Sequence, residues 1–213
     1  MECSENAFCK ILDDDVRKIL CASCRRSIAA AGSFRLHQDF ESKATILLDG
    51  LILYSIRAEE ETVDGTNDVP NFYLAVPGRA LSTDMTFHSG DDRYSFTGVE
   101  MLTDCHIARI EHKALREALE RHPSFAEDLL FNLNTMLRDS CLMSSILRTS
   151  NTTVCVRRLI EFLTEQGAYL TQLQIASLVD RNRASVSRAA KTIKEETPEV
   201  WERYTANKGR AAE

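Results

Sequence analysis

One stretch near the C-terminus, residues 170–194, constrains the fold more than any other part of the chain. Its apolar residues recur at helical spacing in two short runs, which predicts two packed helices joined by a tight turn. In chain order these residues are Leu173, Ile175, Ala176, Val179, Val186, Ala189, Ala190 and Ile193. We expect Thr171 to cap the first helix through its hydroxyl. We expect Asp180 to lie in the turn with a positive φ, because aspartate is one of the few non-glycine residue types that accept it.

The side chains left on the outer face of this helix pair are basic or small and polar. Arginine and asparagine can pair with guanine and adenine edges, and serine and lysine reach phosphates. Such a helix fits the major groove of DNA. We therefore predict DNA contacts at Thr171, Gln172, Arg181, Asn182, Arg183, Ser185, Ser187, Arg188 and Lys191. The same pattern also fits an amphipathic helical hairpin whose basic face is merely solvated.

The distribution of charge is compatible with a small DNA-binding face on an acidic body. The chain has 213 residues, enough for one large or two small domains, and a net charge of -6. Residues 151–213 carry 10 basic and 8 acidic side chains, whereas the preceding part carries 16 and 24. Few phosphates can be neutralised by so few cations, so we expect weak non-specific affinity for DNA.

The part of the chain before residue 110 has the pattern of one helix followed by a small β domain. Residues 13–24 form an amphipathic helix pattern, and its three opening aspartates suit the positive end of the helix dipole. Short runs rich in strand-forming residues follow at 33–37, 45–48, 51–56, 71–76, 94–97 and 105–110. Turn signals separate them, and Asp49-Gly50 between two apolar runs indicates a tight hairpin. Strands at this spacing predict a β-sandwich or roll.

Two helices are expected next, at residues 110–121 and 124–147. The longer one has positions recurring at alternating spacings of four and three, as in the seam of a two-stranded coiled coil. These positions are Leu129, Leu133, Met136, Ser140, Met143 and Leu147. The alternative is that this face packs on the chain's own β domain, and a second apolar stripe at Leu130, Phe131 and Leu137 would allow both. A polar hinge at 148–153 leads to a helix that starts near Thr152, buries Val156, Leu159, Ile160 and Leu163, and ends near Gly167.

This order of parts resembles the Crp/Fnr family of transcription regulators. The resemblance spans residues 12–194 and is strongest at 170–194, at the LLDGL sequence of residues 47–51, at the VPG sequence of residues 76–78 and at Phe87. It implies an α+β fold with a jelly-roll-like β-roll, a long dimerisation helix and a C-terminal winged helix-turn-helix. The corresponding segments are 1–122, 123–149 and 150–213. The implied partners are a second copy of the chain, a palindromic DNA operator and RNA polymerase.

The resemblance also implies roles for the arginines of the second helix. Arg183 and Arg188 lie where the family places contacts to bases and phosphates, and Arg181, Ser187 and Lys191 would position the helix. Two departures limit the analogy. Ala184 stands where the family often has an acidic residue, and residues 195–204 look helical or irregular, so the β-wing is expected to be reduced or missing. The alternative function is therefore a ligand- or partner-binding module whose C-terminal unit does not read DNA.

The resemblance places a sensory pocket between the β-roll and the long helix. Cyclic-nucleotide binders of the family carry a Gly-Glu pair and an Arg-Ser pair, and the corresponding positions here are Ser82-Thr83 and Arg93-Tyr94. Only the arginine matches, and the carboxylate that binds the ribose is lost. We therefore do not expect cyclic AMP, although these four residues are the candidates for an effector pocket.

The cysteines offer a second kind of signal. The oxygen-sensing branch of the family holds an iron–sulfur cluster on four thiolates. The corresponding candidates here are Cys9, Cys21, Cys24 and Cys105, with Cys3 nearby, although their spacing differs from that branch. Buried or incidental thiols are the competing interpretation. Haem is a further hypothesis, without an attachment motif, so the cofactor is left unknown.

Several classes of protein are not expected. No run of about 18 apolar residues is present, and the N-terminus lacks a signal-peptide pattern, so we expect a cytoplasmic protein without a membrane span. The chain contains no nucleophile elbow, phosphate-binding loop or zinc-protease motif. The sequence thus predicts a bacterial, dimeric, non-enzymatic transcription regulator that responds to a small-molecule or redox signal in the β-roll.

Overall fold

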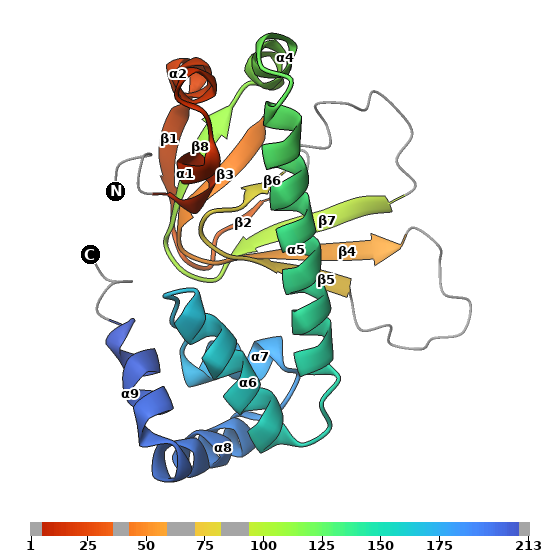
Figure 1. Ribbon diagram of the computed structural model, residues 1–213. Helices are drawn as coiled ribbons and strands as arrows, with labels where there is room; N and C mark the ends of the chain where they lie inside the picture. Colours follow the sequence, from red (N-terminus) through yellow and green to blue (C-terminus); the bar gives the residue numbers. More distant parts are fainter. Residues whose placement is uncertain (1–5, 36–42, 59–70, 82–93, 209–213) are drawn as a thin grey trace. The chain divides into compact units, whose positions relative to one another are not determined.

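The computed structural model describes residues 6–35, 43–58, 71–81 and 94–208. The chain divides into two compact units, Met1–Leu137 and Arg138–Glu213. The first combines helices with antiparallel sheets, and the described part of the second contains helices only (Figure 1). This confirms the α+β class. The division into three functional segments stays a prediction, because helix α5 (Phe125–Leu147) runs across the boundary between the two units.

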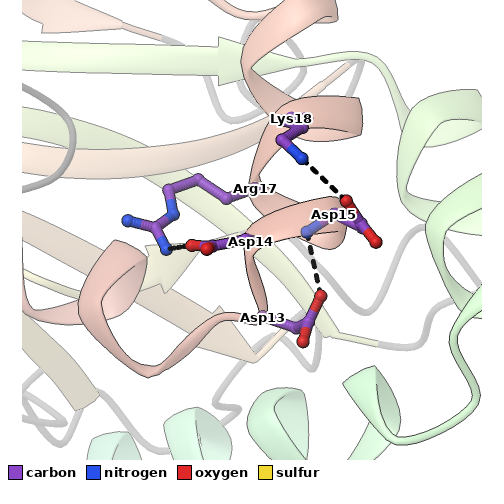
Figure 2. A network of polar contacts seen from close by, with 5 residues as sticks. All are labelled: Asp13, Asp14, Asp15, Arg17 and Lys18. Atoms are coloured by element: carbon purple, nitrogen blue, oxygen red, sulfur yellow. Dashed lines mark hydrogen bonds and ion pairs between the residues drawn. The ribbon is translucent and has the colours of Figure 1, made fainter.

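The first unit begins with two short helices, α1 (Ala7–Ile11) and α2 (Asp14–Ser23). Figure 2 shows how the aspartates serve the start of α2: the Asp13 carboxylate accepts from the Asp15 N–H at 2.8 Å. Asp15 also pairs with Lys18 at 2.9 Å, and Asp14 pairs with Arg17. The negative charges therefore lie in the first turn, as predicted, where they complement the helix dipole.

Within the described residues of the first unit, eight strands form two four-stranded antiparallel sheets. The first sheet has the order β1 (Arg25–Ala29), β8 (Cys105–Ile110), β3 (Ala44–Asp49), β6 (Ala80–Leu81). The second has the order β2 (Phe34–Arg35), β7 (Tyr94–Met101), β4 (Ile52–Ala58), β5 (Asn71–Ala75). Consecutive strands frequently belong to different sheets, which is the arrangement of a roll rather than of a simple meander.

The predicted hairpin at Asp49-Gly50 is wrong, because β3 and β4 belong to different sheets. The turn is tight, with Gly50 at φ 93°, but it passes the chain from one sheet to the other. A Cβ on Gly50 would lie 2.4 Å from the Asp104 carbonyl oxygen, so only glycine fits. Leu51 N–H donates to Thr103 Oγ1 at 2.9 Å, which ties this crossing turn to the turn between β7 and β8.

Alternate residues of β3 enter two separate cores. Ile46 and Leu48 pack with the helices, in a cluster that includes Val16, Leu115 and Phe125. Leu47 points into the roll, in a cluster that contains Ile52, Val99, Met101 and Ile107. This follows from the two-residue period of a strand, whose successive side chains point to opposite faces. Because β3 is buried on both faces, its register is strongly specified.

Helix α4 (His112–Arg121) and helix α5 follow the sheets. Asn132 fixes α5 to the edge strand β6 and is only 4% exposed. Its Nδ2 donates to the Ala80 carbonyl at 3.0 Å, and its Oδ1 accepts from the Ala80 N–H at 3.2 Å. The amide therefore satisfies both backbone groups of an edge residue, as a neighbouring strand would. Nothing in the local sequence pattern predicted this contact.

Candidate nucleic-acid interface

The second unit is built around helix α6 (Thr152–Glu165). Asn151 caps its start by accepting from the Val154 N–H at 3.1 Å. At its end Gly167 takes φ 67°, and the Ala168 N–H donates to the Leu163 carbonyl at 2.8 Å, which confirms the predicted C-cap. The residues predicted to point inward are buried: Val156, Leu159, Ile160 and Leu163. This helix is the support for the elements that follow.

The predicted pair consists of α7 (Gln172–Leu178) and α8 (Arg183–Glu196). Helix α8 packs on α6, and α7 packs on α8. Thr171 caps α7 in a reciprocal capping box, in which the Gln174 side chain accepts from the Thr171 N–H at 2.8 Å. Asp180 takes φ 48° in the turn between the helices. The predicted cap at Thr171 and the predicted positive φ of Asp180 are therefore confirmed, and four residues, 179–182, join the two helices.

The apolar faces of the pair agree with the sequence pattern, with one exception. Ile175, Ala176, Val179, Val186, Ala189, Ala190 and Ile193 are buried. Leu173 is 63% exposed, so its predicted place in the core is wrong, and Leu178 is buried as well. The reason is geometric: positions two apart on a helix point to nearly opposite sides, so Leu173 and Ile175 cannot share one face of a short helix.

The outer face of α8 carries the cations that were predicted to contact DNA. Asn182, Arg183, Ser187, Arg188 and Lys191 are exposed. Ser185 and Arg181 are partly buried, as is Gln172, whereas Thr171 is exposed. Arg183 is the first residue of α8, and Arg188 lies along the same helix, with its Nη2 3.3 Å from Ser185 Oγ. Five basic residues and one acidic residue lie between positions 171 and 194. The helix therefore presents a basic surface and an arginine at its N-terminal end.

Two of the predicted DNA contacts already have structural roles. The Asn182 Oδ1 accepts from the Ser185 N–H at 2.8 Å and so caps α8. Paired recognition of adenine uses both the oxygen and the nitrogen of an asparagine amide, and it would compete with this cap. Thr171 similarly uses its hydroxyl in the capping box of α7. Sequence reasoning assigned the cap to Thr171 but not to Asn182.

A further helix, α9 (Pro198–Ala206), follows α8 where a β-wing would stand. This confirms that residues 195–204 are helical or irregular. Tyr204 anchors α9: its hydroxyl accepts from the Leu170 N–H at 3.0 Å and donates to the Leu170 carbonyl. Its ring lies 4.9 Å from that of Tyr169. Burial raises the pKa of Tyr204, so the hydroxyl stays protonated and both hydrogen bonds persist. The anchor fixes the segment that leads into α7.

The predicted dimer seam on α5 is not one exposed stripe. Leu129 packs in the helix-side core of the first unit, and Met143 is 1% exposed. Leu133 is exposed, whereas Met136, Ser140 and Leu147 are partly buried. The large exposed apolar residues of α5 are Leu130, Phe131, Leu133, Leu137 and Leu142. The seam spacing also occurs in a helix packed on its own domain, and that is the environment of Leu129.

The predicted effector pocket lies almost wholly outside the described residues. This applies to Ser82, Thr83 and Arg93, and also to the landmark Phe87. Tyr94 is described only as the first residue of β7. The landmark glycine Gly78 takes φ 82° in the turn before β6, and its N–H donates to the Leu47 carbonyl at 2.8 Å.

The candidate cluster ligands are not gathered together. In the part of the chain that the structure describes, no three side chains of His, Cys, Asp or Glu lie close enough to hold a metal. Two of these thiols, Cys9 and Cys105, are buried. Cys21 is exposed, Cys24 is partly buried, and Cys3 falls outside the described residues. Burial raises the pKa of Cys105 to about 11, and its Sγ lies 3.3 Å from the Leu51 carbonyl oxygen. Cys105 is thus a packed thiol beneath the crossing turns.

Comparison with known proteins found the fold but no close relative. No protein-family model and no curated protein matches the chain. Among solved structures, the c-di-GMP-responsive regulator CLP of Xanthomonas campestris is similar, with a TM-score of 0.58 and 16% identity over 86% of this chain and 93% of that one. The chain has the fold of the CRP/FNR regulators.

Two further structures support the same assignment of fold. A CRP-family transcriptional regulator from Thermus thermophilus has a TM-score of 0.56 and 16% identity, over 80% of this chain and 85% of its own. A putative cyclic-nucleotide-binding protein from Ruegeria pomeroyi has a TM-score of 0.56 and 14% identity, over 91% and 89%. In addition, none of the described helices has the length and apolar character needed to cross a bilayer.

Proposed function

We propose that this protein is a sequence-specific, DNA-binding transcription regulator of the CRP/FNR family. The observation that carries the proposal is the basic outer face of α8, which begins with Arg183 and follows a tight turn after α7. In helix-turn-helix proteins the N-terminal residues of the second helix contact base edges. Arg183 occupies that place, and its guanidinium suits the paired acceptors of guanine.

The remaining cations would position the helix on the DNA backbone. Arg181, Arg188 and Lys191 lie along or beside α8, and Ser187 directly precedes Arg188. Contacts to phosphates fix the register of a recognition helix but carry no sequence information. The acidic α9 would stay away from the duplex, because its carboxylates and the phosphates repel each other. These assignments divide the surface into one base-reading position and several backbone-contacting ones.

The proposed active species is a homodimer on a palindromic operator. The exposed stripe Leu130, Leu133 and Leu137 on α5 is apolar enough to join two copies, in place of the seam that includes Leu129. Two recognition helices would then meet half-sites about one helical turn apart. A small-molecule or redox signal in the first unit would change the population of the DNA-competent dimer by binding one state more tightly. The protein would act in the cytoplasm, with RNA polymerase as a further partner.

A second candidate is a ligand- or partner-binding module whose helical unit does not read DNA. Two observations favour it: Ala184 stands at the second position of α8, and α9 replaces the wing. A unit of this kind would bind DNA weakly or not at all, and it would show little dependence on sequence.

Selection of DNA fragments from the source genome on the purified full-length protein distinguishes the two candidates. The test compares the native chain with the double variant Arg183→Ala/Arg188→Ala and with Arg203→Ala, which removes an exposed arginine of α9. The regulator proposal expects a palindromic motif from the native chain and from Arg203→Ala, and none from the double variant. The same random background from all three proteins would refute it in favour of the binding module.

A further inference from the structure

A cavity in the second unit lies where α5 ends and α6 begins. Its volume is about 520 Å³, within the range of small-molecule sites. It is lined by Cys141, Ser144, Ser145, Arg148, Thr149 and Arg158. These residues come from the end of α5, the connection after it and the middle of α6. None of them belongs to the surface proposed to contact DNA, and none is acidic.

The charge of this cavity is uncompensated. Arg148 and Arg158 both line it, and neither guanidinium forms an ion pair within the described part of the chain. The neighbouring Arg157 differs, because it pairs with Glu196 on α8. Two guanidinium groups in one concave surface attract a compact anion, and their planar donor sets suit the oxygens of phosphate. The hydroxyls of Ser144 and Ser145 add further donors at the same place.

The negative C-terminal end of α5 repels an anion less strongly than a helix end with unsatisfied carbonyl groups would. Its last carbonyl groups are oriented toward donors of the chain itself. The Ser144 carbonyl accepts from the Arg148 N–H at 3.1 Å, and the Ser145 carbonyl accepts from Thr149 Oγ1 at 3.2 Å. The Ile146 carbonyl accepts from the Thr149 N–H at 3.1 Å. The negative end of the helix is therefore largely satisfied internally, and Arg148 adds a positive charge to it.

We propose that this cavity binds a small phosphate-bearing ligand between Arg148 and Arg158. Its place favours a small molecule over the DNA backbone, because none of its lining residues belongs to the surface proposed to contact DNA. The depression is open to solvent and would hold the phosphate group of the ligand rather than enclose the whole molecule. A ligand held by Arg148, at the end of α5, and by Arg158, on α6, would fix the connection at residues 148–151. Any effect of the bound ligand on DNA binding rests on the proposed function, whereas binding of the anion to the cavity does not.

Alkylation of Cys141 measures occupancy of the cavity directly, because this exposed thiol lines it. Full-length protein in phosphate-free buffer is treated with iodoacetamide at increasing inorganic phosphate, with chloride keeping the ionic strength constant. Digestion with trypsin after Arg138 and Arg148 isolates the thiol in peptide 139–148, and the exposed Cys21 serves as the internal control. We expect saturable slowing at Cys141 alone, about tenfold when phosphate is about ten times its dissociation constant, since only the unoccupied fraction reacts.

The variants separate a built site from general salt effects. Arg158→Gln leaves the peptide unchanged and should abolish protection, Arg158→Lys should weaken it, and Arg203→Gln should retain it. Circular dichroism checks that each variant is folded. Equal slowing at Cys21, or no slowing at Cys141, overturns the proposal. Protection by random-sequence duplex DNA without protection by phosphate also overturns it and identifies a DNA-backbone contact. Recovery of an operator motif is a separate measurement, so either proposal can fail alone.

Discussion

The cap of the recognition helix allows stability and DNA reading to be separated at one residue. Asn182 accepts from the Ser185 N–H at 2.8 Å and directly precedes Arg183, the first residue of α8. Two substitutions at this position differ in a single property. Asn182→Ala removes the acceptor, whereas Asn182→Ser keeps an oxygen that can cap the helix but removes the amide that could recognise adenine.

The magnitude follows from one exposed capping bond. Replacing a good N-cap residue with alanine costs about 1 kcal/mol, whereas serine caps about as well as asparagine. The lost cap lets the first turn of α8 fray, and Arg183 must then be ordered when DNA binds. That ordering cannot cost more than the cap contributed, so affinity should fall by about fivefold at most in Asn182→Ala. If the amide instead recognised a base, Asn182→Ser would lose about 1–3 kcal/mol of discrimination at that position.

Urea unfolding measures the stability of each Asn182 variant, and titration with DNA measures its affinity. Trp201 is the only tryptophan in the chain and lies on α9, 5.9 Å from the Tyr204 ring, so its fluorescence reports on the helical unit. We expect the unfolding free energy to fall in Asn182→Ala and to stay native in Asn182→Ser, with DNA affinity following the same order. Native stability combined with poor DNA binding in Asn182→Ser would contradict a purely capping role, because it would make the amide a base-reading group.

Three further predictions concern the packing that supports the site. Gly50→Ala should lower the unfolding free energy by about 2–5 kcal/mol, from positive-φ strain and a clash, whereas Gly32→Ala, at φ 73° with open space, should show the strain alone, about 1–2 kcal/mol. Equal losses in urea titrations would disprove the clash. Tyr204→Phe should cost about 1–3 kcal/mol, since both backbone groups of Leu170 lose their buried partner; an unchanged thermal midpoint would contradict this. Burial raises the pKa of Cys105 from 9.0 to about 11, so the folded state holds the thiol proton more tightly than the unfolded state does. The stability that the protonated thiol contributes is therefore complete below pH 9 and is lost as the pH rises toward 11. Iodoacetamide at pH 8 should leave Cys105 unmodified until the protein unfolds, and rapid labelling of the native protein would exclude the buried thiol.

Local sequence signals predicted the helical unit well because its rules are local. The cap at Thr171, the positive φ of Asp180 and the buried face of α8 each depend on residues within one or two turns. The wrong placement of Leu173 came from accepting an apolar residue without testing its angle around the helix. The cap at Asn182 obeys the same local rules, so a stricter search for a side-chain acceptor before Arg183 would have found it.

The β domain was less predictable, because its decisive contacts join residues far apart in sequence. Asp49-Gly50 signals a tight turn, but turn chemistry does not determine which sheet receives the next strand. That choice depends on the fit of Gly50 against Asp104 and Cys105, more than fifty residues later. The hydrogen bond from Asn132 to Ala80 likewise joins residues that are far apart in sequence. The seam on α5 was ambiguous for a related reason, since one spacing fits both a partner helix and the chain's own core.

The base preference of Arg183 is the decisive measurement for the proposed reading of DNA. Binding of the native chain and of Arg183→Ala is measured on the selected operator and on variants that differ at each base pair, at one fixed salt concentration. We expect Arg183→Ala to lose about 1–3 kcal/mol of binding free energy on the operator and to stop discriminating between bases at one symmetric pair of positions. An equal loss on every sequence would contradict it, because Arg183 would then contact only phosphate and the base-reading role would have no residue to carry it.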